Sequence, residues 1–306
     1  METPLKIALV GAAGGIGSSV AYTLVLRGIG DEYLLVDPNA AVLETQVMDL
    51  EQLRGMRSFS IRAADPSEIP SADIVVVSAA VPPVRDLPRM DYLRRNLAIT
   101  RQIADQFDGY EDWPGVVIIA SNPVDPLLFD FQARTGIERH RVLGYSINDT
   151  LRFRYGIAEE VGVAPDRVSA WAIGEHGNLC VPLFSRVEID GVPKKFDPDQ
   201  RQRILDYLLG WYPRWVALTT ARTSTWTSGT GLARMIDAVI NEHPDPWPAS
   251  FVLDREYGFS GVAMSLPVQL GRQGVRTVLD WPLSEDERDG LARAERYLAD
   301  IDLATV

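Results

Sequence analysis

The amino-acid sequence predicts an α/β protein, with a Rossmann-type doubly wound parallel sheet followed by a mixed α/β (α+β) catalytic domain. Short apolar runs of strand length alternate with helical patterns through the first half of the chain, which is typical of parallel sheets. A glycine-rich turn joins the first of these strands to the first helix. Beyond residue 144 the pattern becomes richer in helices, so we expect two domains, at residues 1–144 and 145–306.

The first strand, turn and helix have the order that dinucleotide binding requires. An apolar strand at residues 6–10 is followed at once by the glycine-rich segment 11–17 and then by a helical pattern at residues 18–27. Glycines allow backbone amides to approach a pyrophosphate at the positive end of the helix. The candidate cofactor-binding residues in this turn are Gly11, Gly14, Gly15, Ile16 and Gly17.

A carboxylate ends the second predicted strand. Residues 32–36 form an apolar run, and Asp37 follows it about twenty residues after the glycines. A carboxylate at this place can bind the ribose hydroxyls and repel a 2′-phosphate, which favours NAD over NADP as the cofactor. The alternative is that Asp37 only caps the next element.

The rest of the first half continues the alternation. Asn122 follows a strand, and so it is expected at the carboxyl edge of the sheet, where ligands bind in open parallel sheets; it could also cap the following helix. Residues 81–89 contain three prolines and two arginines and predict a loop. The expected strands are residues 58–62, 73–78, 116–120 and 141–144, and the expected helices are residues 41–53 and 91–106.

The second half has a different pattern. Residues 249–253 and 261–266 suggest an antiparallel pair, and residues 284–301 read as a closing amphipathic helix. Further helices are expected at residues 149–161, 198–220 and 229–240, and strand-like runs at residues 168–173 and 183–189.

Bulk composition excludes several classes of function. The chain has 306 residues, 46% of them hydrophobic, which allows a substantial core. Its formal net charge of −12 opposes binding to nucleic acid or to an anionic membrane. We expect no signal peptide, no membrane span and a cytoplasmic protein. The single cysteine, Cys180, excludes an intramolecular disulfide and a multi-cysteine metal site, and we expect no metal.

Three polar residues in the second half form a candidate catalytic site. Asp149 and Arg152 lie one helical turn apart, and His176 stands between two glycines. A carboxylate can orient an imidazole and stabilise its protonated form, while a guanidinium can grip a carboxylate through two parallel hydrogen bonds. This set suits acid/base chemistry on a hydroxyl or carbonyl next to a carboxylate. The alternative for each residue is structural, a surface ion pair or a hydrogen-bonded histidine in a turn.

Five ordered motifs carry a resemblance that covers nearly the whole chain. The sequence resembles the malate/lactate dehydrogenase family, and its motifs are most similar in style to malate dehydrogenases. The resemblance implies NAD(H)-dependent interconversion of a 2-hydroxy acid and a 2-oxo acid by a homodimer or homotetramer. The motifs are Gly11-Ala12-Ala13-Gly14-Gly15-Ile16-Gly17, Ser121-Asn122-Pro123-Val124-Asp125, Asp149-Thr150-Leu151-Arg152, Gly174-Glu175-His176-Gly177 and Ser265-Leu266-Pro267-Val268-Gln269-Leu270-Gly271.

The resemblance also implies a role for each matching residue. His176 would be the general acid/base, Asp149 its carboxylate partner, and Arg152 the group that binds the C1 carboxylate of the substrate. Arg89 would polarise the substrate carbonyl when the loop closes. Asn122 would contact the nicotinamide side of the site and the substrate oxygen, and Asn96 would join the glycine turn, Asp37 and Asn122 in binding the cofactor.

The resemblance implies that the substrate tail is read in the loop at residues 81–89, where this chain departs from the family pattern. The position that selects a second substrate carboxylate falls on Pro83 or on Arg85, depending on the alignment. An arginine there would favour malate and oxaloacetate, and a neutral residue would favour another, lactate-like 2-hydroxy acid. Ser224 falls where relatives line the substrate pocket, although it could instead cap a helix.

Two other readings share some of these features. NAD-dependent glycoside hydrolases have a similar architecture, but they need a cysteine/histidine metal site, which one cysteine and three histidines make improbable. A non-catalytic relative would not need Asp149, Arg152 and His176 together.

Overall fold

The computed structural model describes residues 4–82, 89–110, 112–220 and 223–305. A parallel sheet forms its first half, with strands in the order β3-β2-β1-β4-β5-β6, as expected for a doubly wound fold. The strands are β1 (Lys6–Val10), β2 (Glu32–Val36), β3 (Ser60–Ala63), β4 (Ile74–Val77), β5 (Val116–Ile119) and β6 (Val142–Tyr145). The fold class predicted from the sequence is therefore confirmed.

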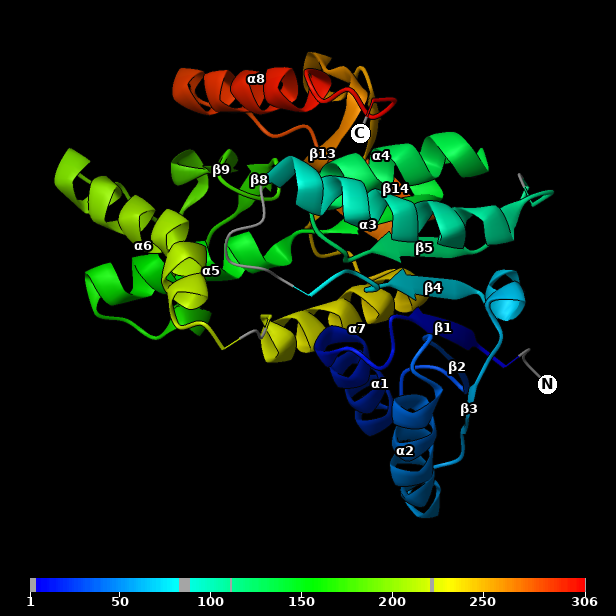
Figure 1. Cartoon of the computed structure of the whole chain (residues 1–306). Coiled ribbons are helices and arrows are strands. Elements are labelled where there is room, and N and C mark those ends of the chain that lie inside the picture. Colours follow the sequence, from blue (N-terminus) through cyan, green and yellow to red (C-terminus); the bar gives the residue numbers. More distant parts are fainter. Residues whose placement is uncertain (1–3, 83–88, 111, 221–222, 306) are drawn as a thin grey trace.

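Helices cover both faces of this sheet. Alternate side chains of β1 enter two different cores: Ile7 and Leu9 pack with α1 (Gly15–Arg27) and α7 (Thr225–Asn241), whereas Ala8 and Val10 pack with α3 (Arg89–Ala104) and α4 (Val124–Thr135). Strands buried on both faces read as unbroken apolar runs, which is why β4 and β5 contain only valine and isoleucine. Figure 1 shows α1 beside α7 and α3 beside α4, with α2 (Ala40–Glu51) at the outer end.

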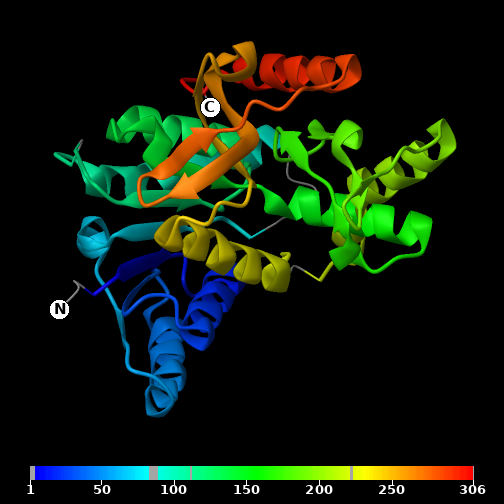
Figure 2. The same cartoon turned by 180° about the vertical axis from the view of Figure 1, so that it is seen from behind.

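The second half extends the same sheet with antiparallel strands. Strand β12 (Trp247–Asp254) pairs with β6 and with the long strand β13 (Ser260–Gly271), which confirms the antiparallel pair expected from the sequence. Figure 2 shows the β13 hairpin with β14 (Gly274–Val278) from behind. Strands β8 (Ala172–Gly174) and β9 (Cys180–Pro182) follow β13, and α8 (Glu285–Ala299) packs over this end.

The remaining elements form a smaller unit. Helix α5 (Ile147–Val161) packs against α6 (Pro198–Ala217), and a small sheet joins β7 (Val168–Ser169), β10 (Glu188–Ile189) and β11 (Val192–Pro193). The expected strand at residues 183–189 is mostly wrong, because Phe184–Arg186 forms a 3-10 turn. The Glu287 carboxylate of α8 accepts the Ser185 backbone N–H at 2.9 Å and its hydroxyl at 2.7 Å, which withdraws this backbone from a ladder.

No helix among the described residues is long and apolar enough to cross a membrane. In the same residues, no group of three or more His, Cys, Asp or Glu side chains could hold a metal ion.

Candidate active site

The glycine turn between β1 and α1 is tightly packed against backbone. Gly11 has a φ of +83°, and a Cβ there would lie 2.5 Å from the Ala79 backbone nitrogen. A Cβ at Gly17 would lie 2.4 Å from the Gly11 carbonyl oxygen. Helix α1 begins after its N-cap residue Gly14. Because glycine has no side chain, Gly14 provides no side-chain cap for the first-turn amides. The turn therefore presents backbone donors at a helix N-terminus, which is the arrangement that binds a pyrophosphate.

Asp37 lies beside this turn. Its Oδ2 accepts the Ala13 backbone N–H at 3.2 Å, and its Oδ1 accepts the Asn39 N–H at 2.9 Å. The N-cap of α2 is Asn39, whose side chain accepts from Val42, so Asp37 does not cap that helix. The structure thus brings the predicted glycines and the predicted carboxylate together, and this set fits a dinucleotide without a 2′-phosphate.

Asn122 and Asn96 lie at the carboxyl edge of the sheet. Asn122 is exposed three residues after the end of β5, and its backbone carbonyl accepts from the Asn96 side-chain amide at 2.7 Å. Asn96 is 0% exposed, and its Oδ1 accepts the Val81 backbone N–H at 2.8 Å. Asn96, predicted as a cofactor-binding residue, therefore joins two loops that border the site, and the sequence did not indicate these two partners.

The three predicted catalytic residues form one hydrogen-bonded cluster. Asp149 and Arg152 are in the first two turns of α5, and His176 is in the turn between β8 and β9. The Asp149 carboxylate accepts from His176 Nδ1 at 2.7 Å through Oδ2 and from Arg152 Nη1 at 3.0 Å through Oδ1. The exposed fraction of these side chains is 7% for Asp149, 11% for His176 and 17% for Arg152. Asp149 and Arg152 are therefore not a surface ion pair, which was the structural alternative. Together with His176 they form a largely buried triad.

The triad sets the protonation of the imidazole. Burial lowers the pKa of His176, but the charge of Asp149 and its hydrogen bond outweigh burial, so the pKa is raised above its ordinary value. Because Nδ1 is bonded to Asp149, we assign its proton there, which leaves Nε2 to exchange a proton with a ligand. A histidine held in this way can act as an acid or as a base near neutral pH.

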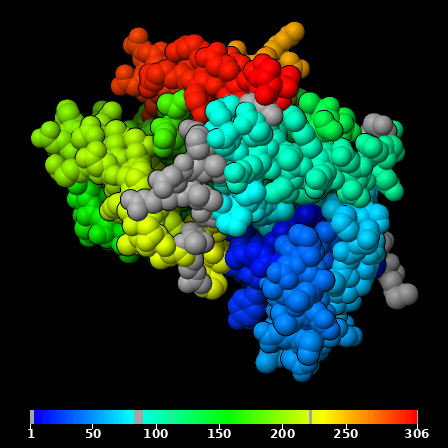
Figure 3. Space-filling view, viewed as in Figure 1, coloured from blue at the N-terminus to red at the C-terminus, as the bar shows by residue number. Residues whose placement is uncertain are grey.

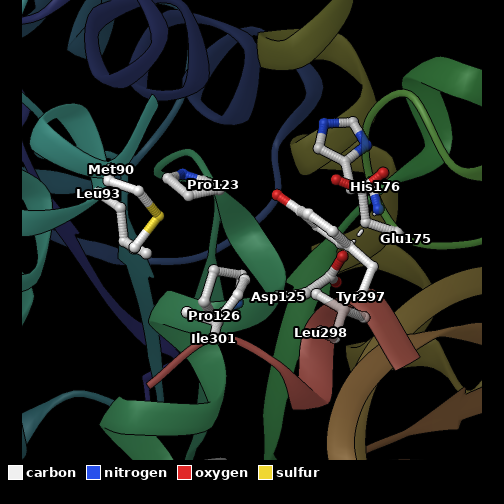
Figure 4. Close-up of a pocket in the computed structure, with 10 residues that line it drawn as sticks. All are labelled: Met90, Leu93, Pro123, Asp125, Pro126, Glu175, His176, Tyr297, Leu298 and Ile301. Atoms are coloured by element: carbon white, nitrogen blue, oxygen red, sulfur yellow. Dashed lines mark hydrogen bonds between the residues drawn. The ribbon is translucent and has the colours of Figure 1, made fainter. Parts of the chain in front are cut away.

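A second buried carboxyl supports the same turn. Asp125, 1% exposed at the start of α4, accepts the His176 backbone N–H at 2.7 Å and the Ser250 hydroxyl at 2.6 Å. Burial raises the pKa of Asp125 to about 7, in spite of those two hydrogen bonds. Figure 4 shows Asp125 bonded to the His176 segment, beside a small cavity that Asp125, His176, Glu175 and Pro123 all line. Asp125 was predicted only as the last residue of the motif at residues 121–125, and no local feature of the sequence indicates its partners.

Glu175 holds the far side of this turn. It is buried, and its Oε2 accepts the Leu179 backbone N–H at 2.8 Å. A Cβ at Gly177 would lie 2.5 Å from Oε1 of Glu175, which explains why a glycine follows the histidine.

The residues expected at the substrate tail and at the substrate carbonyl are only partly placed. Ser224 is half-buried at the N-cap position of α7, where its side chain makes no capping hydrogen bond. Arg89 begins α3, but its side chain is outside the described part of the structure. Pro83 and Arg85 also lie outside the described residues.

Comparisons with known proteins agree over nearly the whole chain. Residues 5–144 match the lactate/malate dehydrogenase NAD binding domain, and residues 148–303 match the lactate/malate dehydrogenase alpha/beta C-terminal domain. A malate dehydrogenase of Natronomonas pharaonis is 32% identical over 96% of this chain and 97% of its own length. An L-lactate dehydrogenase of Nitratidesulfovibrio vulgaris is 31% identical over 96% of this chain and 98% of its own length.

Solved structures show the same likeness. A minor L-lactate dehydrogenase from Enterococcus mundtii superimposes with a TM-score of 0.87 at 25% identity, covering 98% of this chain and 99% of that one.

Proposed function

Because the chain belongs to the lactate/malate dehydrogenase family, an NAD-dependent group of enzymes, we propose that it interconverts malate and oxaloacetate. The observation that carries the chemistry is the buried Asp149–His176–Arg152 triad. Relatives of both names are 30–33% identical, so the choice of malate rests on Arg85, a cation in the loop where the family reads the substrate tail.

The cofactor supplies the hydride acceptor or donor, and the protein supplies the proton chemistry. In the oxidation of malate, His176 Nε2 takes the proton of the substrate hydroxyl, and Asp149 stabilises the imidazolium that forms. In the reduction of oxaloacetate, Nε2 returns this proton to the developing alkoxide. The raised pKa of His176 keeps both forms accessible near neutral pH.

Besides Arg85 at the tail carboxylate, two arginines hold the substrate in this proposal. Arg152 binds the C1 carboxylate through a pair of N–H donors while its Nη1 stays bonded to Asp149. Arg89 polarises the carbonyl, and Ser224 lines the tail pocket. The glycine turn, Asp37, Asn96 and Asn122 hold NAD(H), with Asn96 acting through the backbone at Val81 and Asn122.

The second candidate is a dehydrogenase of another 2-hydroxy acid, favoured by the curated L-lactate dehydrogenases among the relatives. Both matching family models describe dehydrogenase domains, which argues against a glycoside hydrolase or a non-catalytic relative. We also propose a cytoplasmic homodimer or homotetramer with domains at residues 1–144 and 145–306. Sedimentation over a range of protein concentrations tests the assembly, and a monomer throughout contradicts it.

Steady-state kinetics with NADH test the substrate. We expect kcat/KM for oxaloacetate to exceed kcat/KM for pyruvate and for bulkier 2-oxo acids, and the absence of that preference rejects the malate assignment. Arg85→Gln should lower kcat/KM for oxaloacetate far more than for pyruvate. The tail carboxylate of oxaloacetate loses its cationic partner, whereas pyruvate has no tail carboxylate. Arg94→Gln is the control, since Arg94 is an exposed arginine of α3 that pairs with Asp91. Equal effects of Arg85→Gln on both substrates reject its role.

A further inference from the structure

Helix α6 places an aromatic ring against the arginine of the triad. The guanidinium carbon of Arg152 lies 4.0 Å from the centroid of the Trp211 ring, within the range of a cation–π contact. Trp215, one turn further along α6, stacks on Trp211 with ring centroids 5.0 Å apart and an angle of 19° between the planes. Arg152 is therefore held at one edge by Asp149 and on one face by an aromatic pair.

The two contacts leave a defined part of the guanidinium for a ligand. All five N–H donors of a guanidinium lie in its plane, so a ring over its face does not use them. Asp149 takes one donor at Nη1. With one edge and one face held, the side chain loses most of its rotational freedom, which reduces the entropy that a ligand must otherwise remove on binding.

The position of Trp211 suits its contact with Arg152 more than packing in the core beneath α6. The buried residues of α6 are Ile204 and Leu208, whereas Trp211 is half-buried and Tyr212 beside it is 56% exposed. Figure 3 shows α6, in yellow-green, on the surface of the molecule. A separate aromatic stack between Tyr155 and Tyr207, with centroids 5.4 Å apart, also joins α6 to α5. The docking of α6 thus has contacts other than Trp211.

We propose that Trp211 is a positioning residue, which orients the Arg152 guanidinium to receive the carboxylate of the 2-oxo acid. This inference rests on the proposed function, in which Arg152 binds that carboxylate. Trp211 acts through Arg152 and need not touch the cofactor. Its loss should therefore weaken carboxylate binding and leave NADH binding unchanged.

The test measures binding of oxamate, a carboxylate that mimics a 2-oxo acid but accepts no hydride, to the enzyme–NADH complex. Trp211→Leu is expected to weaken oxamate binding about tenfold, or about 1.4 kcal/mol, and to raise KM for the 2-oxo acid more than it lowers kcat. Trp211→Phe, which keeps an aromatic face, should stay within about threefold of the parent. NADH affinity should be unchanged in both variants.

The matched control is Trp281→Leu. Arg186 lies 4.2 Å from the Trp281 ring centroid, in a stack of the same kind in which neither residue belongs to the triad. This variant should bind oxamate as the parent does. A loss of oxamate affinity in Trp281→Leu equal to that in Trp211→Leu would overturn the inference.

Arg152→Gln separates the inference from the function on which it rests. If Arg152→Gln abolishes oxamate binding while Trp211→Leu binds oxamate like the parent, Arg152 keeps its role and the role of Trp211 is rejected. If Arg152→Gln binds oxamate like the parent, the proposed role of Arg152 itself fails. Should Trp211→Leu not bind NADH, Trp211→Met provides the same comparison, and parental oxamate affinity in that variant rejects the inference.

Discussion

Replacing Asp125 by asparagine is expected to stabilise the folded protein at alkaline pH. Asn has nearly the same shape, so its carbonyl can accept the His176 backbone N–H and its amide can donate to the Ser250 hydroxyl oxygen. The difference is that Asn never carries a charge. In the parent protein an ionised carboxylate is buried at this position above neutral pH, and burial of a charge costs free energy.

The sign and size of the expected stability difference follow from the pKa of Asp125. It is about 7 in the folded protein, raised by burial, against 3.8 for an ordinary aspartate. Between these values the folded state binds the proton and the unfolded chain does not, so stability is complete below the lower value and is lost as the pH rises through the higher one. A difference of about three units at about 1.4 kcal/mol each gives a penalty of up to about 4 kcal/mol above pH 7. About half of that penalty develops between pH 5.5 and 8.5.

Urea unfolding followed by tryptophan fluorescence at pH 5.5 and 8.5 measures this difference, at one protein concentration because assembly changes apparent stability. Asp125→Asn should gain about 2 kcal/mol relative to the parent on going from pH 5.5 to 8.5. The control is Asp130→Asn on the same helix, which breaks a close pair with Arg101 at 2.7 Å and should lose stability at both pH values. A pH-independent effect of Asp125→Asn, or a variant less stable than the parent at pH 8.5, refutes the reasoning.

Three further predictions concern the triad, the helix packing and the cofactor. Asp149→Asn removes the charge that raises the pKa of His176, so the base-dependent rise of kcat/KM for oxidation should move to lower pH; an unchanged pH profile contradicts the link. Gly229→Ala places a Cβ 2.1 Å from the Ser19 hydroxyl oxygen between α7 and α1 and should cost about 1–3 kcal/mol of unfolding free energy, whereas Gly210→Ala, with open space around it, should not be destabilised. Asp37→Ser should raise kcat/KM for NADPH relative to NADH, because the carboxylate beside the glycine turn no longer repels a 2′-phosphate, and an unchanged ratio argues against that role.

Local patterns in the sequence predicted much of the fold. The order of strand, glycine turn and helix at residues 6–27 is contiguous, and buried parallel strands such as β4 appear as unbroken apolar runs. Asp149 and Arg152 are one helical turn apart, so their pairing could be inferred once α5 was expected. The antiparallel pair β12–β13 was expected from the two apolar runs at residues 249–253 and 261–266.

Contacts between distant parts of the chain could not be predicted in this way. Asp125 lies 51 residues before His176, whose backbone N–H donates to it. No local sequence feature near either residue indicates this contact. The same holds for the contact of Trp211 with Arg152. From the sequence alone, an aromatic residue on an amphipathic helix predicts only a packing role. At residues 183–189 an apolar pattern favoured a strand. In the structure, the Ser185 backbone N–H instead donates to the carboxylate of Glu287 on α8, which is distant in the sequence.

The central claim is that the triad at Asp149, Arg152 and His176 binds and protonates a 2-oxo acid. A crystal structure of the complex with NADH and oxamate tests it most directly. We expect the oxamate carboxylate to lie on the Arg152 guanidinium through two hydrogen bonds, with its carbonyl oxygen within hydrogen-bond distance of His176 Nε2. A carboxylate held by another cation, with His176 Nε2 away from the carbonyl, would contradict the claim.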